Sequence, residues 1–295
     1  MPATPRPTTF RRAALFALAL STSLAAATAA AYVRTRSPDG KFPLAWTNPR
    51  ITMTLRTSGT QVVPIGDFVG AASRAGLAWS DPSLSSAVAF TIDAQSDAPG
   101  GTRYDQVNSV SFRTDSWPEP MYPESALALT TVWSQDGQIV DADTEINAHD
   151  PGYKWGVLPD DPDLAAMASE VDLQNALTHE FGHVLGLSHP CTLGDPAAKP
   201  ELDDTGAPVL SCSDPALPAS VRDATMFPSS QAGSIAERPL SPDEAKALHD
   251  IYPVRPVDPP GLGDRSGGCG VAPGGPSPLA ALLLAAAAVV ARRRR

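Results

Sequence analysis

Three histidines and one glutamate lie between residues 179 and 189 at spacings that suit metal chemistry. On a helix His179 and His183 are one turn apart and about 40° apart around the axis, so their rings can share one metal ion. Glu180 lies on the neighbouring face, where its carboxylate can take a proton from water instead of binding the metal. We therefore predict that both histidines bind zinc and that Glu180 is a general base.

A third ligand requires the chain to change direction. His189 is ten residues beyond His179, so on a straight helix it would lie about 280° round the axis and about 15 Å along it. Gly186 can adopt the left-handed conformation that ends a helix, which would let His189 turn back to the metal. Three histidine ligands leave the fourth position open for water, as hydrolysis requires.

The elements that must position this motif can be predicted from hydrophobic periodicity. A helix is expected from about residue 170 to 185, carrying the motif, and another over 65–79. Ser241 and Glu244 form a capping box that predicts a third helix ending near residue 252. Strands are expected at 51–55, 87–92, 110–112, 126–132 and 138–140. This order favours an α+β (α/β-like) fold with helices packed on a sheet.

With these residues in view, the sequence resembles the metzincin clan of zinc metalloproteases, which share the extended zinc motif and a downstream Met-turn. Residues 224–228, with Met226 at their centre, are similar to that turn. Alone, Met226 would be interpreted as a core filler. The Met-Phe-Pro order is closest to the matrixin-like families, and Pro228 stands where other metzincins carry a tyrosine that can approach zinc. The likeness covers roughly residues 43–253.

The resemblance implies a metzincin catalytic domain with a mixed twisted sheet, an active-site helix, a Met-turn and a C-terminal helix. It also implies a zinc endopeptidase whose protein or peptide substrate runs antiparallel to an edge strand, for which 126–133 is the candidate. One alternative is a catalytically silent, zinc-binding interaction module of the cell surface. Another zincin type, such as an aminopeptidase, would use a downstream glutamate as third ligand, a role that His189 already fills here.

Three cysteines allow one disulfide in the folded domain. Cys191 and Cys212 lie between the zinc motif and Met226, in a connection longer than the usual matrixin one. In a protein that folds outside the reducing cytosol we expect a disulfide between them, with zinc ligation by either as the alternative. We expect the resulting loop to border the primed side of the cleft.

The two ends do not have the composition of a packed core. Residues 1–31 combine early arginines, an apolar run and small residues, which predicts a signal peptide, with a membrane anchor as the alternative. Residues 254–268 have the composition of a Pro/Gly-rich linker. Residues 269–295 resemble myxobacterial sorting tails, which implies processing or lipidation at Cys269 and a membrane association; a single-pass anchor is the alternative. We expect an exported, extracellular or cell-surface/outer-membrane-associated monomer whose catalytic domain spans 32–253.

The net charge of −10 excludes nucleic acid as a natural partner. Acidic clusters at Asp93 and Asp97, and over residues 136–145, have oxygen ligands suited to Ca²⁺, but we favour roles in turns and caps. Of the remaining histidines, His149 is expected in a surface loop and His249 near a helix C-terminus, so no second zinc site is expected.

Overall fold

The computed structural model describes residues 32–58, 62–117, 122–149, 152–194, 201–254 and 287–290. The predicted signal peptide, all but the first residue of the predicted linker, and Cys269 lie outside these residues. Within the described part of the chain, no helix is long and apolar enough to cross a membrane.

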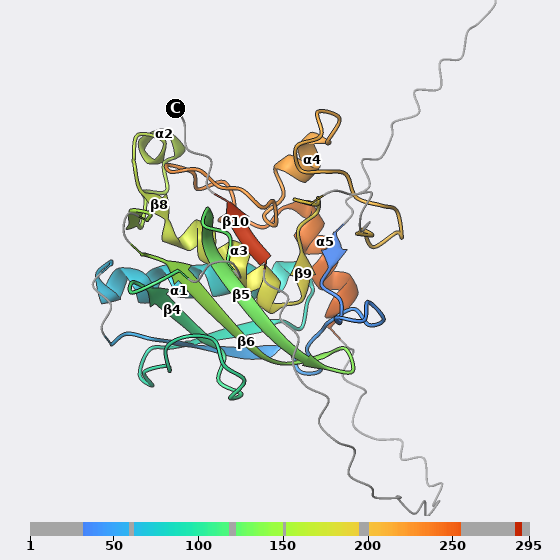
Figure 1. Cartoon of the computed structure of the whole chain (residues 1–295), viewed down its shortest axis with the longest axis horizontal. Helices are drawn as coiled ribbons and strands as arrows, with labels where there is room; N and C mark the ends of the chain where they lie inside the picture. The colour runs from blue at the N-terminus through green and yellow to red at the C-terminus, as the bar shows by residue number, and fades with distance from the viewer. Residues whose placement is uncertain are drawn as a thin grey trace, which may run out of the picture.

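A six-stranded mixed sheet forms one layer of the domain, in the order β10-β5-β6-β4-β2-β3 (Figure 1). Strands β6, β4, β2 and the edge strand β3 are parallel, whereas β5 runs antiparallel to β6 and β10 antiparallel to β5. This mixed α/β architecture agrees with the predicted α+β class. The strands are β2 (Arg50–Leu55), β3 (Ala89–Asp93), β4 (Ser109–Arg113), β5 (Ala126–Gln135), β6 (Gln138–Asn147) and β10 (Ala287–Val290).

The hairpin between β5 and β6 has a two-residue turn whose chemistry can be read locally. Asp136 and Gly137 both have positive φ, of 50° and 83°. An Asp-Gly pair suits a type I′ turn, which matches the twist of the strands on either side. Both strands extend beyond their predicted ends, to Gln135 and Asn147.

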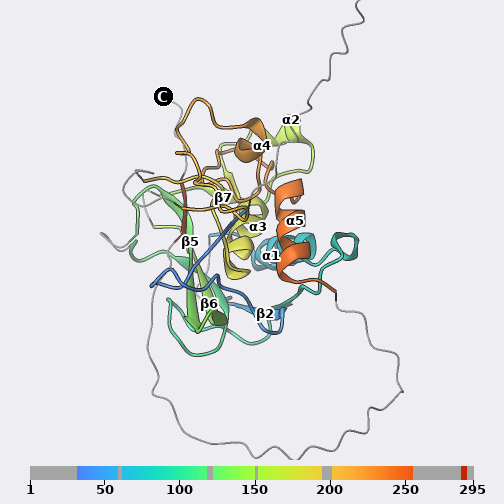
Figure 2. The same cartoon turned by 90° about the vertical axis from the view of Figure 1, so that its right-hand side faces the viewer.

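Two long helices cover one face of the sheet, as Figure 2 shows, and contact each other as well as the strands. Helix α1 (Ile65–Trp79) has the predicted bounds, and α3 (Leu173–Val184) carries the first part of the histidine motif. Aromatic side chains join the layers: Phe68 meets Phe112 edge to face, and Phe90 stacks on Phe181, each pair with ring centroids 5.0 Å apart.

Helix α5 (Pro242–Ile251) begins with the predicted capping box. Beyond its end, the hydroxyl of Tyr252 donates to the carbonyl of Leu185 at 2.8 Å, which ties this helix to the end of α3. The shorter elements are β1 (Val33–Arg34), η1 (Pro82–Leu84), β7 (Trp155–Gly156), α2 (Pro162–Ala165), β8 (Val171–Asp172), β9 (Leu187–Ser188) and α4 (Ala219–Arg222).

Two expectations need correction. The motif helix begins at Leu173 instead of residue 170, because Val171 and Asp172 form β8 and the Asp172 side chain caps the helix at the amide of Asn175. The strand expected at the sheet edge, β5, is not outermost, because β10 pairs with it through Ala126, Leu129 and Thr130. Four residues of the predicted tail thus form a strand of the domain's sheet.

Candidate metal centre

The three predicted histidine ligands converge in the folded chain. One ring nitrogen from each of His179, His183 and His189 lies within 4.8 Å of the others, and all three side chains are buried. The Nε2 atoms of His179 and His183 are 3.1 Å apart, close to the spacing of about 3.3 Å that two nitrogens have on a tetrahedral zinc ion. In the described residues this is the only cluster of three or more groups able to bind a metal.

The turn that brings His189 back occurs at Gly186, as predicted. Its φ of 82° is left-handed, and its amide donates to the carbonyl of His183 at 2.9 Å. A Cβ at this position would lie 2.6 Å from the carbonyl oxygen of Leu44, so glycine is also required by space. Beyond the turn, β9 pairs with β1 near the N-terminal end of the domain, which fixes the path to His189.

Backbone carbonyls orient two of the rings. Nδ1 of His179 lies 2.9 Å from the carbonyl oxygen of Thr225, and Nδ1 of His183 lies 2.8 Å from that of Leu187. Because a carbonyl oxygen can only accept, each Nδ1 carries the proton and each Nε2 presents a lone pair to the centre. Nε2 of His189 is buried without a partner in the described residues.

Burial lowers the pKa of all three imidazoles, and the neighbouring histidines lower those of His179 and His189 further. The rings are therefore neutral near pH 7. Neutral imidazoles whose lone pairs crowd together, one of them without any donor, fit a cation held between them. Nitrogen donors in this number suit zinc.

Glu180 lies beside the triad and outside the ligand cluster. Its carboxyl group is fully buried, Oε2 accepts a hydrogen bond from Oγ1 of Thr130 at 2.7 Å, and Oε1 has no partner in the described residues. Burial raises the pKa of this carboxyl to about 8, while the Thr130 hydrogen bond opposes the rise. Such a group can take and return a proton near neutral pH.

Met226 lies beneath the motif helix. Its side chain is buried against Gly182, where an added Cβ would be 2.2 Å from the sulfur. Its amide donates to Oε1 of Glu244 at 3.0 Å, so α5 holds this segment in place. The same segment supplies the Thr225 carbonyl that orients His179. The identity of this segment as a Met-turn stays a prediction.

Thr130 and the anchoring role of Glu244 were not found from the sequence. Thr130 contacts a residue 50 positions away, and one threonine in a strand has no distinguishing pattern. The capping box did identify Glu244, but its second contact, with the amide of Met226, depends on how α5 packs.

Cys191 and Cys212 form the predicted disulfide, with their Cα atoms 5.0 Å apart. Each sulfur is thereby committed to the other, so neither is a zinc ligand. The bond closes a loop that begins two residues after His189. That loop also contacts the start of the domain, because the amide of Asp204 donates to the carbonyl of Tyr32 at 2.9 Å. Its relation to the primed side stays a prediction.

The acidic clusters act as loop anchors. Asp141 accepts from the amides of Asp105 and Gln106, and Asp143 accepts from the amide of Arg103 and from Ser109. Asp93 and Asp97 likewise accept from nearby backbone amides. Only Asp93, which accepts from amides two and three residues further on, has the local turn role favoured from the sequence. Asp97, Asp141 and Asp143 instead bind loops 34 to 40 positions away. His249 lies in the last turn of α5, as expected.

The sequence matches no protein-family model and no curated protein at a significant level. The interpretation of this centre therefore depends on its own geometry.

Proposed function

We propose that this chain is an exported zinc metalloendopeptidase of the metzincin type, closest to the matrixin-like families. One observation carries the proposal: three neutral histidines meet in a buried cluster, and the buried carboxyl of Glu180 lies next to them without belonging to the cluster. Zinc hydrolases require this division between metal ligands and a proton acceptor.

His179, His183 and His189 would hold the ion through Nε2. When bound, zinc lowers the pKa of water to about 7 and polarises a peptide carbonyl. Glu180 accepts the proton of the attacking water at Oε1, the oxygen without a partner, while Thr130 fixes Oε2. As the C–N bond breaks, Glu180 passes that proton to the leaving amine, so one water is consumed for each bond cleaved.

The substrate backbone aligns along β5 in this proposal. Thr130 lies on this strand and contacts Glu180, so a peptide paired with the outer side of β5 would pass close to the general base. In the full chain β10 already pairs there through Ala126, Leu129 and Thr130. Substrate and residues 287–290 therefore compete for the same strand, and removal of the tail frees it.

Two further features support parts of the proposal. The Cys191–Cys212 disulfide is the kind of bond that persists outside the cytosol, which supports export. The packing of Met226 under Gly182 supports the assignment of residues 224–228 as a Met-turn.

The proposal is tested by mixing the purified chain, full-length and ending at residue 254, with a library of extended peptides. Zinc content is measured on the same samples before and after chelation. We expect one zinc per chain, internal cleavage that stops on chelation and returns with zinc, and faster cleavage by the shortened protein. Stoichiometric zinc without cleavage by either form would instead favour the silent binding module. Absence of zinc binding would refute both.

A further inference from the structure

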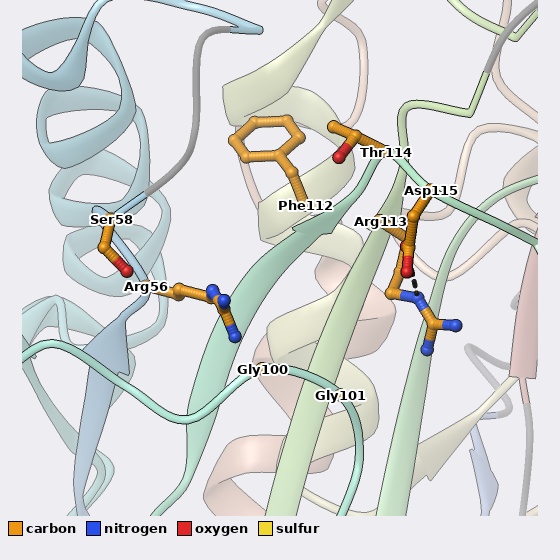
Figure 3. A pocket seen from close by; sticks show the side chains of 8 residues that line it. All are labelled: Arg56, Ser58, Gly100, Gly101, Phe112, Arg113, Thr114 and Asp115. Carbon is orange, nitrogen blue, oxygen red and sulfur yellow. Dashed lines mark ion pairs between the residues drawn. The ribbon is translucent and has the colours of Figure 1, made fainter.

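A cavity of about 360 Å³ lies where the parallel strands β2 and β4 end, and it shares no lining residue with the metal centre. Figure 3 shows Arg56 and Ser58 on one side, Phe112 above, Arg113, Thr114 and Asp115 on the other side, and the Gly100–Gly101 loop below. The carboxyl ends of parallel strands are common places for ligands in sheets of this kind.

Arg56 is the unusual member of this lining. Four arginines in the described residues are buried or half-buried, and the guanidinium of each of the other three has at least one protein acceptor. Arg34 donates to a carbonyl, Arg113 pairs with Glu145, and Arg238 pairs with Asp172. Arg56 has no side-chain hydrogen bond or ion pair with any described residue. Arg56 is partly buried as a residue, and no acceptor in the described residues replaces the water that its side chain loses.

The loop beneath Arg56 is shaped to receive its guanidinium. A Cβ on Gly100 would lie 1.6 Å from Nη1 of Arg56, so the guanidinium packs directly on this glycine and would have to move if a side chain were added there. The carbonyl of Gly100 accepts from Arg103 at 2.6 Å, and the amide of Arg103 donates to the buried carboxylate of Asp143 at 2.9 Å. Arg56 therefore packs against a loop whose own position is fixed by hydrogen bonds.

The charge on the opposite wall is already compensated. Arg113 lies 2.7 Å from Oε1 of Glu145 and 3.7 Å from Asp115. The lining residue Ser58 donates its amide to Asp97, which lies outside the lining and also accepts from the amide of Thr57. Arg56 is thus the single cation of the described cavity wall that lacks a partner, and the carboxylate of Asp115 on the same wall disfavours a multiply charged anion.

The apolar part of the wall is Phe112, a residue that is 8% exposed and whose ring contacts that of Phe68. A ligand group placed between this ring and Arg56 would have an aromatic surface on one side and guanidinium donors on the other. Pockets for small molecules commonly combine an apolar wall with a few polar groups that fix orientation.

We propose that this cavity binds a small organic monocarboxylate with an apolar arm, its carboxylate paired with Arg56 and its arm against Phe112. A planar carboxylate matches the fork of guanidinium donors. A single negative charge neutralises Arg56, whereas a phosphate dianion would bring excess negative charge into a cavity that Asp115 already lines. This site is independent of the metal centre and of the proposed peptidase activity.

The test is calorimetric titration of the full chain with phenylacetate, with the neutral analogue 2-phenylethanol and with inorganic phosphate. We expect saturable binding of phenylacetate, and binding at least about tenfold weaker for the other two probes. Arg56→Met keeps the apolar stem and should weaken phenylacetate binding by about tenfold or more. The matched control is Arg50→Gln, which removes a charge from the exposed far end of β2 and should leave binding unchanged.

Gly100→Ala provides a second, charge-neutral perturbation. Its Cβ displaces the Arg56 guanidinium, so it should weaken binding in the wild-type background but have little further effect in Arg56→Met. Near-UV circular dichroism of each variant checks that the fold is kept. The proposal is overturned if phenylacetate does not saturate the wild type, if 2-phenylethanol binds equally well, or if Arg50→Gln has the effect of Arg56→Met.

Discussion

Removal of the Cys191–Cys212 disulfide is expected to destabilise the domain through its unfolded state. The two cysteines are 21 positions apart. Closing a loop of that length removes about 11 cal/mol/K of entropy from the unfolded chain, or about 3.3 kcal/mol at 25 °C. For a domain of this size, that loss lowers the melting temperature by about 7 to 13 °C.

Loss of the disulfide should also lower the zinc affinity of the metal centre. His189 is two residues before Cys191, and the path between β9 and the disulfide is fixed at both ends. Without the bond the third ligand is held less firmly, so zinc affinity should fall together with the free energy of unfolding. A zinc-free preparation isolates the loop effect, because metal bound only by the folded state adds its own stabilisation.

The assay is guanidinium denaturation of the wild type, the reduced wild type and the double variant Cys191→Ala/Cys212→Ala, with competitive zinc titration of each. Reduction leaves the cysteine side chains in place, so agreement between the reduced protein and the double variant shows that loop closure, and not lost packing, is responsible. A loss below about 1 kcal/mol in both would refute the loop-closure reasoning.

Three further changes test other parts of the structure. Thr130→Val removes the hydrogen bond that the Glu180 carboxyl accepts from Thr130. The free energy of unfolding should fall by about 1 to 3 kcal/mol. Because this bond lowers the pKa of Glu180, its loss should also move the acid limb of the peptidase pH profile to higher pH. A profile that does not move would contradict the assigned proton acceptor. Burial, and to a smaller extent the charge of Glu244, raise the pKa of Asp243 to about 7 in the folded protein, above the unfolded value of about 3.9. The folded state therefore loses stability relative to the unfolded state as the pH rises from about 3.9 to about 7. Asp243→Asn should therefore stabilise more at about pH 8 than at about pH 5, and an equal effect at both would exclude the titration. Gly182→Ala forces a Cβ to within 2.2 Å of the Met226 sulfur and should destabilise by about 1 to 3 kcal/mol; the control Gly66→Ala in α1 meets nothing within 4 Å and should be neutral or stabilising, and similar values for both would argue against tight packing under the motif helix.

Local chemistry explains which parts of this structure could be predicted. The α1 bounds follow from its apolar periodicity, the start of α5 from its capping box, and the turn at Gly186 from the left-handed conformation that glycine permits. The convergence of three histidines followed from helix geometry plus that single turn.

Strand β6 shows why other parts were missed. The prediction stopped at residue 140, yet Asp141, Asp143 and Glu145, which follow it, are all buried in the strand. They are tolerated there because backbone amides and Arg113 satisfy their oxygens. Those partners lie 30 to 40 positions away in the sequence, so no local sequence pattern predicts them.

The partners of β5 also depend on contacts far apart in the sequence. Thr130 reaches Glu180 across 50 positions, and β10 reaches β5 from the far end of the chain. Composition identified residues 269–295 as a tail, but whether part of a tail pairs with a strand depends on which strand is left open by the rest of the fold.

The most direct test of the central claim is the Glu180→Ala variant, measured for both zinc content and peptide hydrolysis. Glu180 lies next to the histidine triad without belonging to it. We predict one zinc per chain, as in the wild type, and hydrolysis reduced by at least about a hundredfold. A variant that cleaves peptide at a rate near that of the wild type would contradict the assignment of Glu180 as the general base of a zinc peptidase.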